Sequence, residues 1–312
     1  MTAALALLIG GLLLAVTCHR PLRWLADRRV HPTILLTGWI LAVVALMAVL
    51  VAVLGLLALS AAAPRAPVLV WLCQCWSRLF HGSSPETRSI AATLSALGTA
   101  ALLARLGRAL AVRTHLRRRQ RPHLQQRRLL TAGQPFREPI WVRDDRALAL
   151  SVGGRPGLIL MSDTLRHRLT PPAFTAALEH ERAHLRGRHH VLVAIVETLA
   201  TALPLIPLLR AAPAAVKDLV ELAADAGAAR LCGTAAVREA LASLTGEIAQ
   251  PAFGLAMAER LIQARLTRLA VGSIGEHRAV RLVGCTAVAI GVLLLPAATG
   301  WLGMHLAGRV FC

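Results

Sequence analysis

Residues 170–190, TPPAFTAALEHERAHLRGRHH, determine which fold and which chemistry to expect. A threonine followed by two prolines is typical of a helix start, because the threonine hydroxyl caps the first turn and proline suits its first positions. The pattern from Ala173 to about His189 then predicts a helix. His180 and His184 lie four residues apart, so both imidazoles leave one face of that helix and can bind a single metal ion.

Glu181 follows the first of these histidines and is therefore expected beside the metal instead of on it. A general base needs this position to take a proton from a water molecule that the metal activates and to pass it to the leaving amine. The motif predicts a zinc-dependent hydrolase. A surface helix with scattered histidines and glutamates is the alternative interpretation.

A hydrolytic zinc site with two histidines usually needs a third protein ligand, often glutamate. The stretch VKDLVELAADAGAARL (216–231) contains Glu221 and Asp225 four residues apart on one helical face. We predict Glu221 as the third ligand and Asp225 as a partner that orients a ligand histidine through its other ring nitrogen. An ordinary solvated pair of acids is the alternative, although only 16 acidic residues occur in the chain.

The residues before the helix, IWVRDDRALALSVGGRPGLILMSDTL (140–165), predict a strand, a turn and a second strand. The run at 157–162 is placed to offer a sheet edge to which an extended substrate adds as a further strand. A core strand is an equally good interpretation of this run.

The composition indicates a membrane protein, since 56% of the residues are hydrophobic and the mean hydropathy is +0.59. Crossing the hydrocarbon core takes a helix of about 20 residues. The predicted spans are residues 2–18, 34–62, 89–112 and roughly 282–306. The first lacks both a preceding basic segment and a small-residue cleavage site, so a retained span explains it better than a signal peptide.

The positive charge predicts the orientation. The formal net charge is +19, and arginines gather between the first two spans and in residues 113–128. Short loops of this kind face the cytoplasm, so we expect both termini outside and residues 113–281 inside the plasma membrane. The basic run is explained better by contact with anionic lipid headgroups than as a nucleic-acid arm, and no nucleic-acid-binding motif is found.

The apolar segment 191–209 is long enough to be taken for a further span. A single crossing would leave His180 and Glu221 on opposite sides of the membrane, so it cannot cross once if both bind one metal. Pro204 and Pro207 instead favour a broken, re-entrant or interfacial helix, or a core helix under the site.

The predicted fold class is therefore a mainly α membrane protein with a small β-sheet. Residues 1–112 carry three spans, residues 113–281 form a cytoplasmic, gluzincin-like α+β peptidase domain of the zincin class, and residues 282–312 form a fourth span with a short tail.

The six cysteines include no CxxC pair, which argues against a cysteine-rich zinc site.

The sequence resembles the BlaR/MecR-type integral membrane zinc metallopeptidases. The resemblance rests on VGGRPGLILMSDTL (152–165), LEHERAHLRGRHH (178–190), ELAAD (221–225) and the arrangement of three spans, peptidase region and fourth span. The HtpX/Ste-type membrane proteases are also similar, since they share the His-Glu and Glu-xxx-Asp signature.

The resemblance implies one zinc ion per chain, with His180, His184 and Glu221 as ligands and Glu181 as catalytic base. His189 stands where such families often have aspartate or histidine, which implies a supporting role beside the ligands. His189 and His190 as plain solvated residues are an equally good interpretation.

Two features depart from the family pattern. Arg182 replaces a residue that is usually apolar, but it is expected to face away from the ligand pair. BlaR-type receptors also carry an extracellular penicillin-binding sensor after the last span, whereas this sequence ends at Cys312. Direct sensing of β-lactams is therefore not expected, and a signal would enter through the spans, the loops or a partner.

The leading hypothesis is a membrane endopeptidase that cuts a cytoplasmic or membrane-proximal protein, such as the transcriptional repressors that the resemblance implies. An HtpX-like protease for membrane-protein quality control is the first alternative. A membrane signalling adaptor without catalysis is the second. The expected partners are thus a protein or peptide substrate and the lipid bilayer, while the sequence leaves the oligomeric state open.

Overall fold

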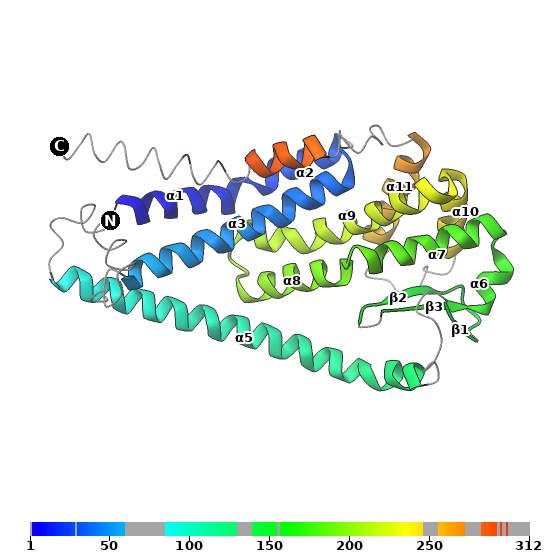
Figure 1. The fold of residues 1–312 in the computed structure, drawn as a ribbon, viewed down its shortest axis with the longest axis horizontal. Coiled ribbons are helices and arrows are strands. Elements are labelled where there is room, and N and C mark those ends of the chain that lie inside the picture. Colours follow the sequence, from blue (N-terminus) through cyan, green and yellow to red (C-terminus); the bar gives the residue numbers. More distant parts are fainter. Residues whose placement is uncertain are drawn as a thin grey trace.

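The computed structural model describes residues 2–28, 30–59, 85–129, 139–154, 157–245, 255–271 and 282–291, with positions 294 and 298. The described chain is mostly helical with one small sheet, as the sequence predicts. The first half supplies the helices α1 (Thr2–Thr17), α2 (His19–Asp27), α3 (Pro32–Leu59) and α5 (Pro85–Leu129), of which α1 and α3 are apolar along their whole length. Helices α1, α3 and α5 extend towards the end of the molecule where the N-terminus lies, and the sheet lies at the opposite end (Figure 1).

Within the described residues, two helical stretches are long and apolar enough to cross a membrane, Pro32–Gly55 in α3 and Ala92–His115 in α5. They overlap the predicted spans 34–62 and 89–112. Helix α1 has 16 residues, fewer than a span needs. Of the predicted span 282–306, the structure describes the helix Leu282–Gly291, and most of the rest lies outside the described residues.

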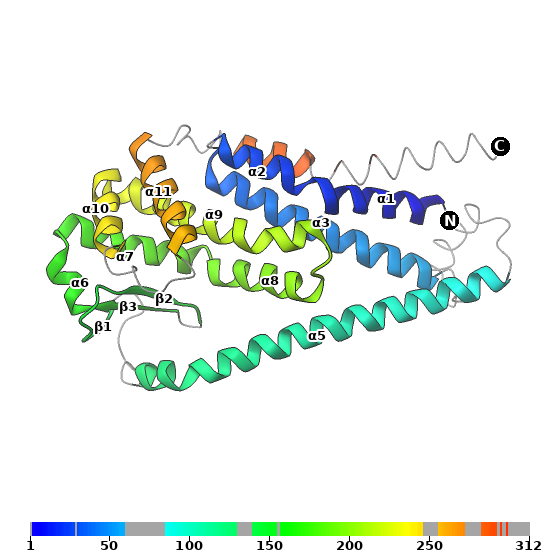
Figure 2. The same ribbon diagram turned by 180° about the vertical axis from the view of Figure 1, so that it is seen from behind.

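The predicted boundary at residue 112 falls within α5, which continues to Leu129 without a break. Figure 2 shows α5 along one edge of the molecule, with α8 (His189–Ala202) and α9 (Pro207–Cys232) between it and α3. A buried apolar core joins α3, α8 and α9, with Trp39 and Leu35 of α3 packed in one cluster with Leu208 and Val216 of α9.

The apolar segment 191–209 forms most of α8 and the start of α9, which pack together as a hairpin. The helix ends at Ala202, and the chain reverses before Pro207, where a proline suits the first turn of the next helix. The connecting turn points towards the end of the molecule that holds the N-terminus (Figure 1). Helix α9 thus runs back alongside α8, and its later turns pack against α7.

Three strands form the sheet: β1 (Ile140–Val142), β2 (Ala149–Val152) and β3 (Leu158–Ser162), in the order β1-β3-β2. β3 is parallel to β1 and antiparallel to β2. Of the two interpretations of residues 157–162, the core strand is confirmed and the open edge is wrong, because β3 is paired on both sides. The described edge strand next to α7 (Pro171–Arg186) is β2.

Helix α7 begins as predicted, with the Thr170 hydroxyl accepting a hydrogen bond from the Ala173 N–H. It ends at Arg186 and not near His189, which belongs to α8. Alanines of α7 pack closely against the sheet and α10 (Thr234–Thr245), in clusters that include Ala173 and Ala176. Helix α11 (Leu255–Val271) packs beside α9 and α10.

Candidate metal centre

Two helices supply the candidate metal ligands. His180 and His184 lie one turn apart on α7, and Glu221 lies on the adjacent face of α9. The two helices approach closely because Gly227 of α9 faces Ala183 of α7. A Cβ atom at Gly227 would lie 3.4 Å from that of Ala183. The small residues allow side chains from both helices to reach a common point.

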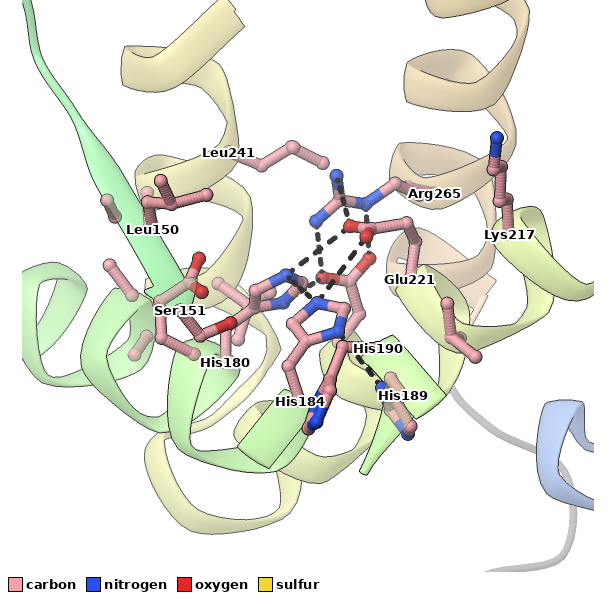
Figure 3. Close-up of a pocket in the computed structure, with 18 of the residues that line it drawn as sticks. Leu150, Ser151, His180, His184, His189, His190, Lys217, Glu221, Leu241 and Arg265 are labelled. Carbon is pink, nitrogen blue, oxygen red and sulfur yellow. Dashed lines mark hydrogen bonds and ion pairs between the residues drawn. The ribbon is translucent and has the colours of Figure 1, made fainter. Parts of the chain in front are cut away.

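The three ligand side chains converge. Nε2 of His180 lies 3.1 Å from Nε2 of His184. The two oxygens of Glu221 divide between them, with Oε2 3.4 Å from Nε2 of His180 and Oε1 3.4 Å from Nε2 of His184. One ligand atom from each residue falls within 4.8 Å of the others. The structure therefore brings together the three residues that the sequence singles out (Figure 3).

Asp225 is placed to orient the first histidine. Its carboxylate lies 3.0 Å from Nδ1 of His180, and its side chain is only 3% exposed. With Nδ1 donating its hydrogen to the carboxylate, Nε2 keeps a lone pair that points at the convergence of ligands. This is the contact that the four-residue spacing from Glu221 predicts.

His189 contacts the other ligand histidine. Its Nδ1 lies 3.0 Å from Nδ1 of His184, and the side chain is buried, so the alternative of a solvated His189 is wrong. The chain reaches this position through Arg188, which has a left-handed φ of 48°. Gly187 is needed because a Cβ atom there would lie 2.3 Å from Nε2 of His189. His190, in contrast, is exposed.

Arg265 of α11 completes the site and was not predicted from the sequence. Its Nε and one terminal nitrogen donate to the Asp225 carboxylate at 2.6 and 2.8 Å, and another nitrogen lies 3.4 Å from Glu221. One turn further, Arg268 donates to the carbonyls of Ala26 and Val30. Helix α11 is thus anchored between the metal centre and the α2–α3 connection.

The charges in this cluster are strongly coupled. Burial acts to lower the pKa of His180, but hydrogen bonds with Asp225 and Glu221 outweigh it and raise the pKa to about 9. Burial lowers the pKa of His184 to about 4, with a contribution from the charge on His180. Burial alone would raise the pKa of Asp225, yet its hydrogen bonds with Arg265 and His180 lower it to about 2. Protonation of His180 occupies Nε2, so a metal ion that binds there would have to displace this proton, while Nδ1 keeps its hydrogen bond with Asp225.

A cleft of about 790 Å³ opens over the three ligands. Glu181 lines it together with the ligands, as a general base must. The edge strand β2 forms one wall through residues 149–151, and apolar residues of α7, α10 and α11 form another. The exposed His190 also lines the cleft.

Searches against protein-family models, curated proteins and solved structures found no match. The chemistry assigned to the site therefore rests on its own geometry and on the sequence motifs.

Proposed function

We propose that this chain is an integral membrane zinc-dependent endopeptidase. The observation that carries the proposal is the convergence of His180, His184 and Glu221 from two helices, with ligand atoms 3.1 to 3.4 Å apart. A structural role for such a cluster would not require a wide cleft above it, whereas hydrolysis does. The cleft and the base at its wall favour catalysis.

The ligand set fits zinc. Zinc binds imidazole nitrogen and carboxylate oxygen at about 2.0–2.1 Å, and in a tetrahedral site neighbouring ligand atoms are then roughly 3.3 Å apart. The two histidine nitrogens lie 3.1 Å apart, and each has a carboxylate oxygen of Glu221 at 3.4 Å, so the three side chains are close to the spacing that zinc needs. Asp225 and His189 each contact Nδ1 of a different ligand histidine, which leaves both Nε2 atoms for the metal.

Zinc held here would supply Lewis-acid activation of water at neutral pH. Glu181 is proposed to take the proton from the attacking water and to deliver it to the amine that leaves when the peptide bond breaks. Arg265 keeps Asp225 ionised and fixed, so that His180 retains the orientation that binding requires.

The edge strand β2 is proposed to hold the substrate. The Ser162 N–H donates to the Leu148 carbonyl, so in this antiparallel register the backbone groups of Leu150 also face β3. The backbone N–H and C=O groups of Ala149 and Ser151 then point away from β3 to the open edge of β2, on the side of the cleft. An extended peptide can add to this edge and pass the metal centre.

The membrane assignment is supported by exposed apolar surface. Only 11% of the apolar stretch Ala92–His115 is buried within the molecule, and large apolar side chains of α1 and α5 face outward, including Leu12, Leu94 and Leu103. Soluble monomers rarely expose apolar surface of this extent. We propose a multi-pass protein of the plasma membrane with the cleft on the cytoplasmic side.

The biological role follows from the resemblance to BlaR/MecR-type peptidases. We propose signalling-linked cleavage of a cytoplasmic protein, such as a transcriptional repressor. Quality control of the HtpX type shares the same chemistry and differs in substrate. An adaptor without catalysis is the remaining alternative, and it predicts metal binding at most.

The test uses the detergent-purified full chain, with zinc content and casein cleavage as readouts. We expect about one zinc per chain and cleavage by the wild type, retention of zinc without cleavage by Glu181→Gln, and loss of zinc by His184→Ala. His167→Ala removes an exposed histidine of α6 (Asp163–Arg168) and serves as the matched control. A wild type that binds no zinc contradicts the proposal, and cleavage that survives in Glu181→Gln contradicts the assigned base.

A further inference from the structure

One end of the cleft carries positive charge. Arg113 of α5 and Lys217 of α9 both line it, on the α5 and α8 side of the metal centre. Among the described lining residues the acids are Glu181, Glu221 and Asp225, which all belong to the metal centre. In Figure 3, Lys217 lies on the opposite side of the ligands from Leu150 of the edge strand. We refer to Arg113 and Lys217 as the cationic end.

A carboxylate behind the cationic end holds both side chains in place. Glu197 of α8 lies 2.7 Å from a terminal nitrogen of Arg113 and 2.6 Å from Nζ of Lys217. In the described part of the chain, Glu197 does not line the cleft, whereas both of its partners do. The three side chains together keep a charge of about +1 at neutral pH, because two cations share one anion.

The cationic end retains unused hydrogen-bond donors. Lys217 is 54% exposed and one of its three ammonium hydrogens suffices for Glu197. Nε of Arg113 is buried without a hydrogen-bond partner among the described residues. Because this nitrogen is itself shielded, the donors that an entering group can reach are the terminal nitrogens of Arg113, whose side chain is 23% exposed, and the ammonium of Lys217.

The distance from the metal centre sets the position of the group that would bind. Lys217 precedes Glu221 by four residues on α9, so the two side chains leave the helix about 6 Å apart along its axis. An extended peptide advances about 3.3 Å per residue. The cationic end therefore lies about two residues from the bond that the metal centre would cut.

We propose that the preferred substrates are peptides with an aspartate or glutamate about two residues from the scissile bond, bound by Arg113 and Lys217. The proposal rests on the peptidase function proposed above. It gives the ion cluster a role in selecting substrates, since an acidic side chain brings the counter-charge that Glu197 alone does not supply. Basic side chains at the same position meet repulsion instead.

The test first maps a cleavage site in casein by mass spectrometry. Two series of fluorogenic peptides are then made from that site. One series carries Glu, Ala or Lys as the second residue before the cut bond, and the other carries them as the second residue after it. We expect the wild type to cleave the Glu peptide on one side with a kcat/KM at least roughly fivefold above that of the matching Lys peptide. Equal rates for Glu and Lys on both sides would overturn the proposal and leave the peptidase function intact.

Charge variants assign the preference to the cationic end. Lys217→Glu should reverse the Glu-to-Lys ratio, and Lys217→Met, which does not repel Glu197, should reduce it. Arg210→Glu changes the net charge by the same amount as Lys217→Glu, but at an exposed position of α9 that does not line the cleft. This control should keep the wild-type ratio. A wild-type ratio in both Lys217 variants would exclude the assignment.

A second test does not depend on catalysis. Lys217 is the only lysine in the chain, so its acetylation by a mild amine reagent can be followed at one peptide. In the Glu181→Gln variant, the Glu peptide should slow this acetylation at least roughly twofold more than the Lys peptide, through contact with Nζ. Equal rates with both peptides would contradict binding at this end, even if casein is cleaved normally.

Discussion

Replacing Arg265 by methionine should destabilise the protein strongly. The guanidinium is 14% exposed and forms two hydrogen bonds with Asp225, whose side chain is only 3% exposed. Removing one partner of a buried ion pair costs about 3–5 kcal/mol, because the other charge stays buried without compensation. Asp225 keeps its contact with His180, so we expect a loss of about 3 kcal/mol, at the lower end of that range.

The assay is unfolding by urea in detergent, followed by tryptophan fluorescence, in the presence of a chelator so that metal loss does not contribute. The double variant Arg265→Met/Asp225→Asn carries no stranded charge and should recover at least about 1 kcal/mol of the loss. Arg238→Met, at an exposed position of α10, should change stability by less than about 0.5 kcal/mol. Additive losses in the double variant, or a loss below about 1 kcal/mol for Arg265→Met, would refute the reasoning.

Three further predictions concern the surroundings of the ligands. Asp225→Asn should weaken zinc binding by about 10–100-fold in competition with a chromophoric chelator, and an unchanged affinity would exclude the orienting contact. Gly187→Ala places a Cβ atom 2.3 Å from Nε2 of His189 and should weaken zinc binding by about tenfold, while Gly55→Ala, with open space, should not. Burial acts to raise the pKa of Glu179, but hydrogen bonds from two arginines outweigh it and lower the pKa. The ionised group therefore stabilises the fold at a pH above its pKa in the unfolded chain, and this stabilisation is lost as the pH falls through its pKa in the folded protein. Glu179→Gln should therefore unfold at a lower temperature than the wild type at pH 7, by a difference that shrinks as the pH falls, and a difference that stays constant with pH would contradict this.

The sequence predicts the candidate site well where the relevant geometry is local. The helix start at Thr170 and the pairing of His180 with His184 depend on contacts within one or two turns, which fixed spacing determines. Glu221 and Asp225 were predicted from the requirements of a zinc site, since a site with two histidines needs a further acidic ligand and acids are rare in this chain. The structure brings all four side chains together.

The order of the strands could not be read from the sequence. A buried apolar strand and an edge strand share the same short apolar pattern, and the difference lies in which neighbours pair with them. Here β1 has only three residues, yet its parallel pairing with β3 covers the edge that residues 157–162 were expected to offer. The open edge belongs to β2, where residues 149–152 form the shorter apolar run.

Arg265 was missed because nothing in its sequence environment distinguishes it from the other arginines. The chain has 35 basic residues, and Arg265 lies 40 positions after the carboxylate that it contacts. Its role arises only when α11 packs against α9. One signal was present: Asp225 was predicted to lie against a ligand histidine, and an acid buried at such a place needs cations around it, which predicts an arginine or lysine nearby without identifying it.

Two independent arguments lead to the same path of the chain between α8 and α9. Hydropathy alone would make residues 191–209 a span, and the chemistry excludes a single crossing because His180 and Glu221 must meet. The structure reverses the chain between Ala202 and Pro207, at the prolines that disfavour a continuous helix. The reversal lets α9 return along α7, and the close contact at Gly227 then sets Glu221 opposite both histidines. The apolar hairpin is thus the arrangement that the sequence argument requires if one metal ion is bound by residues on both sides of the segment.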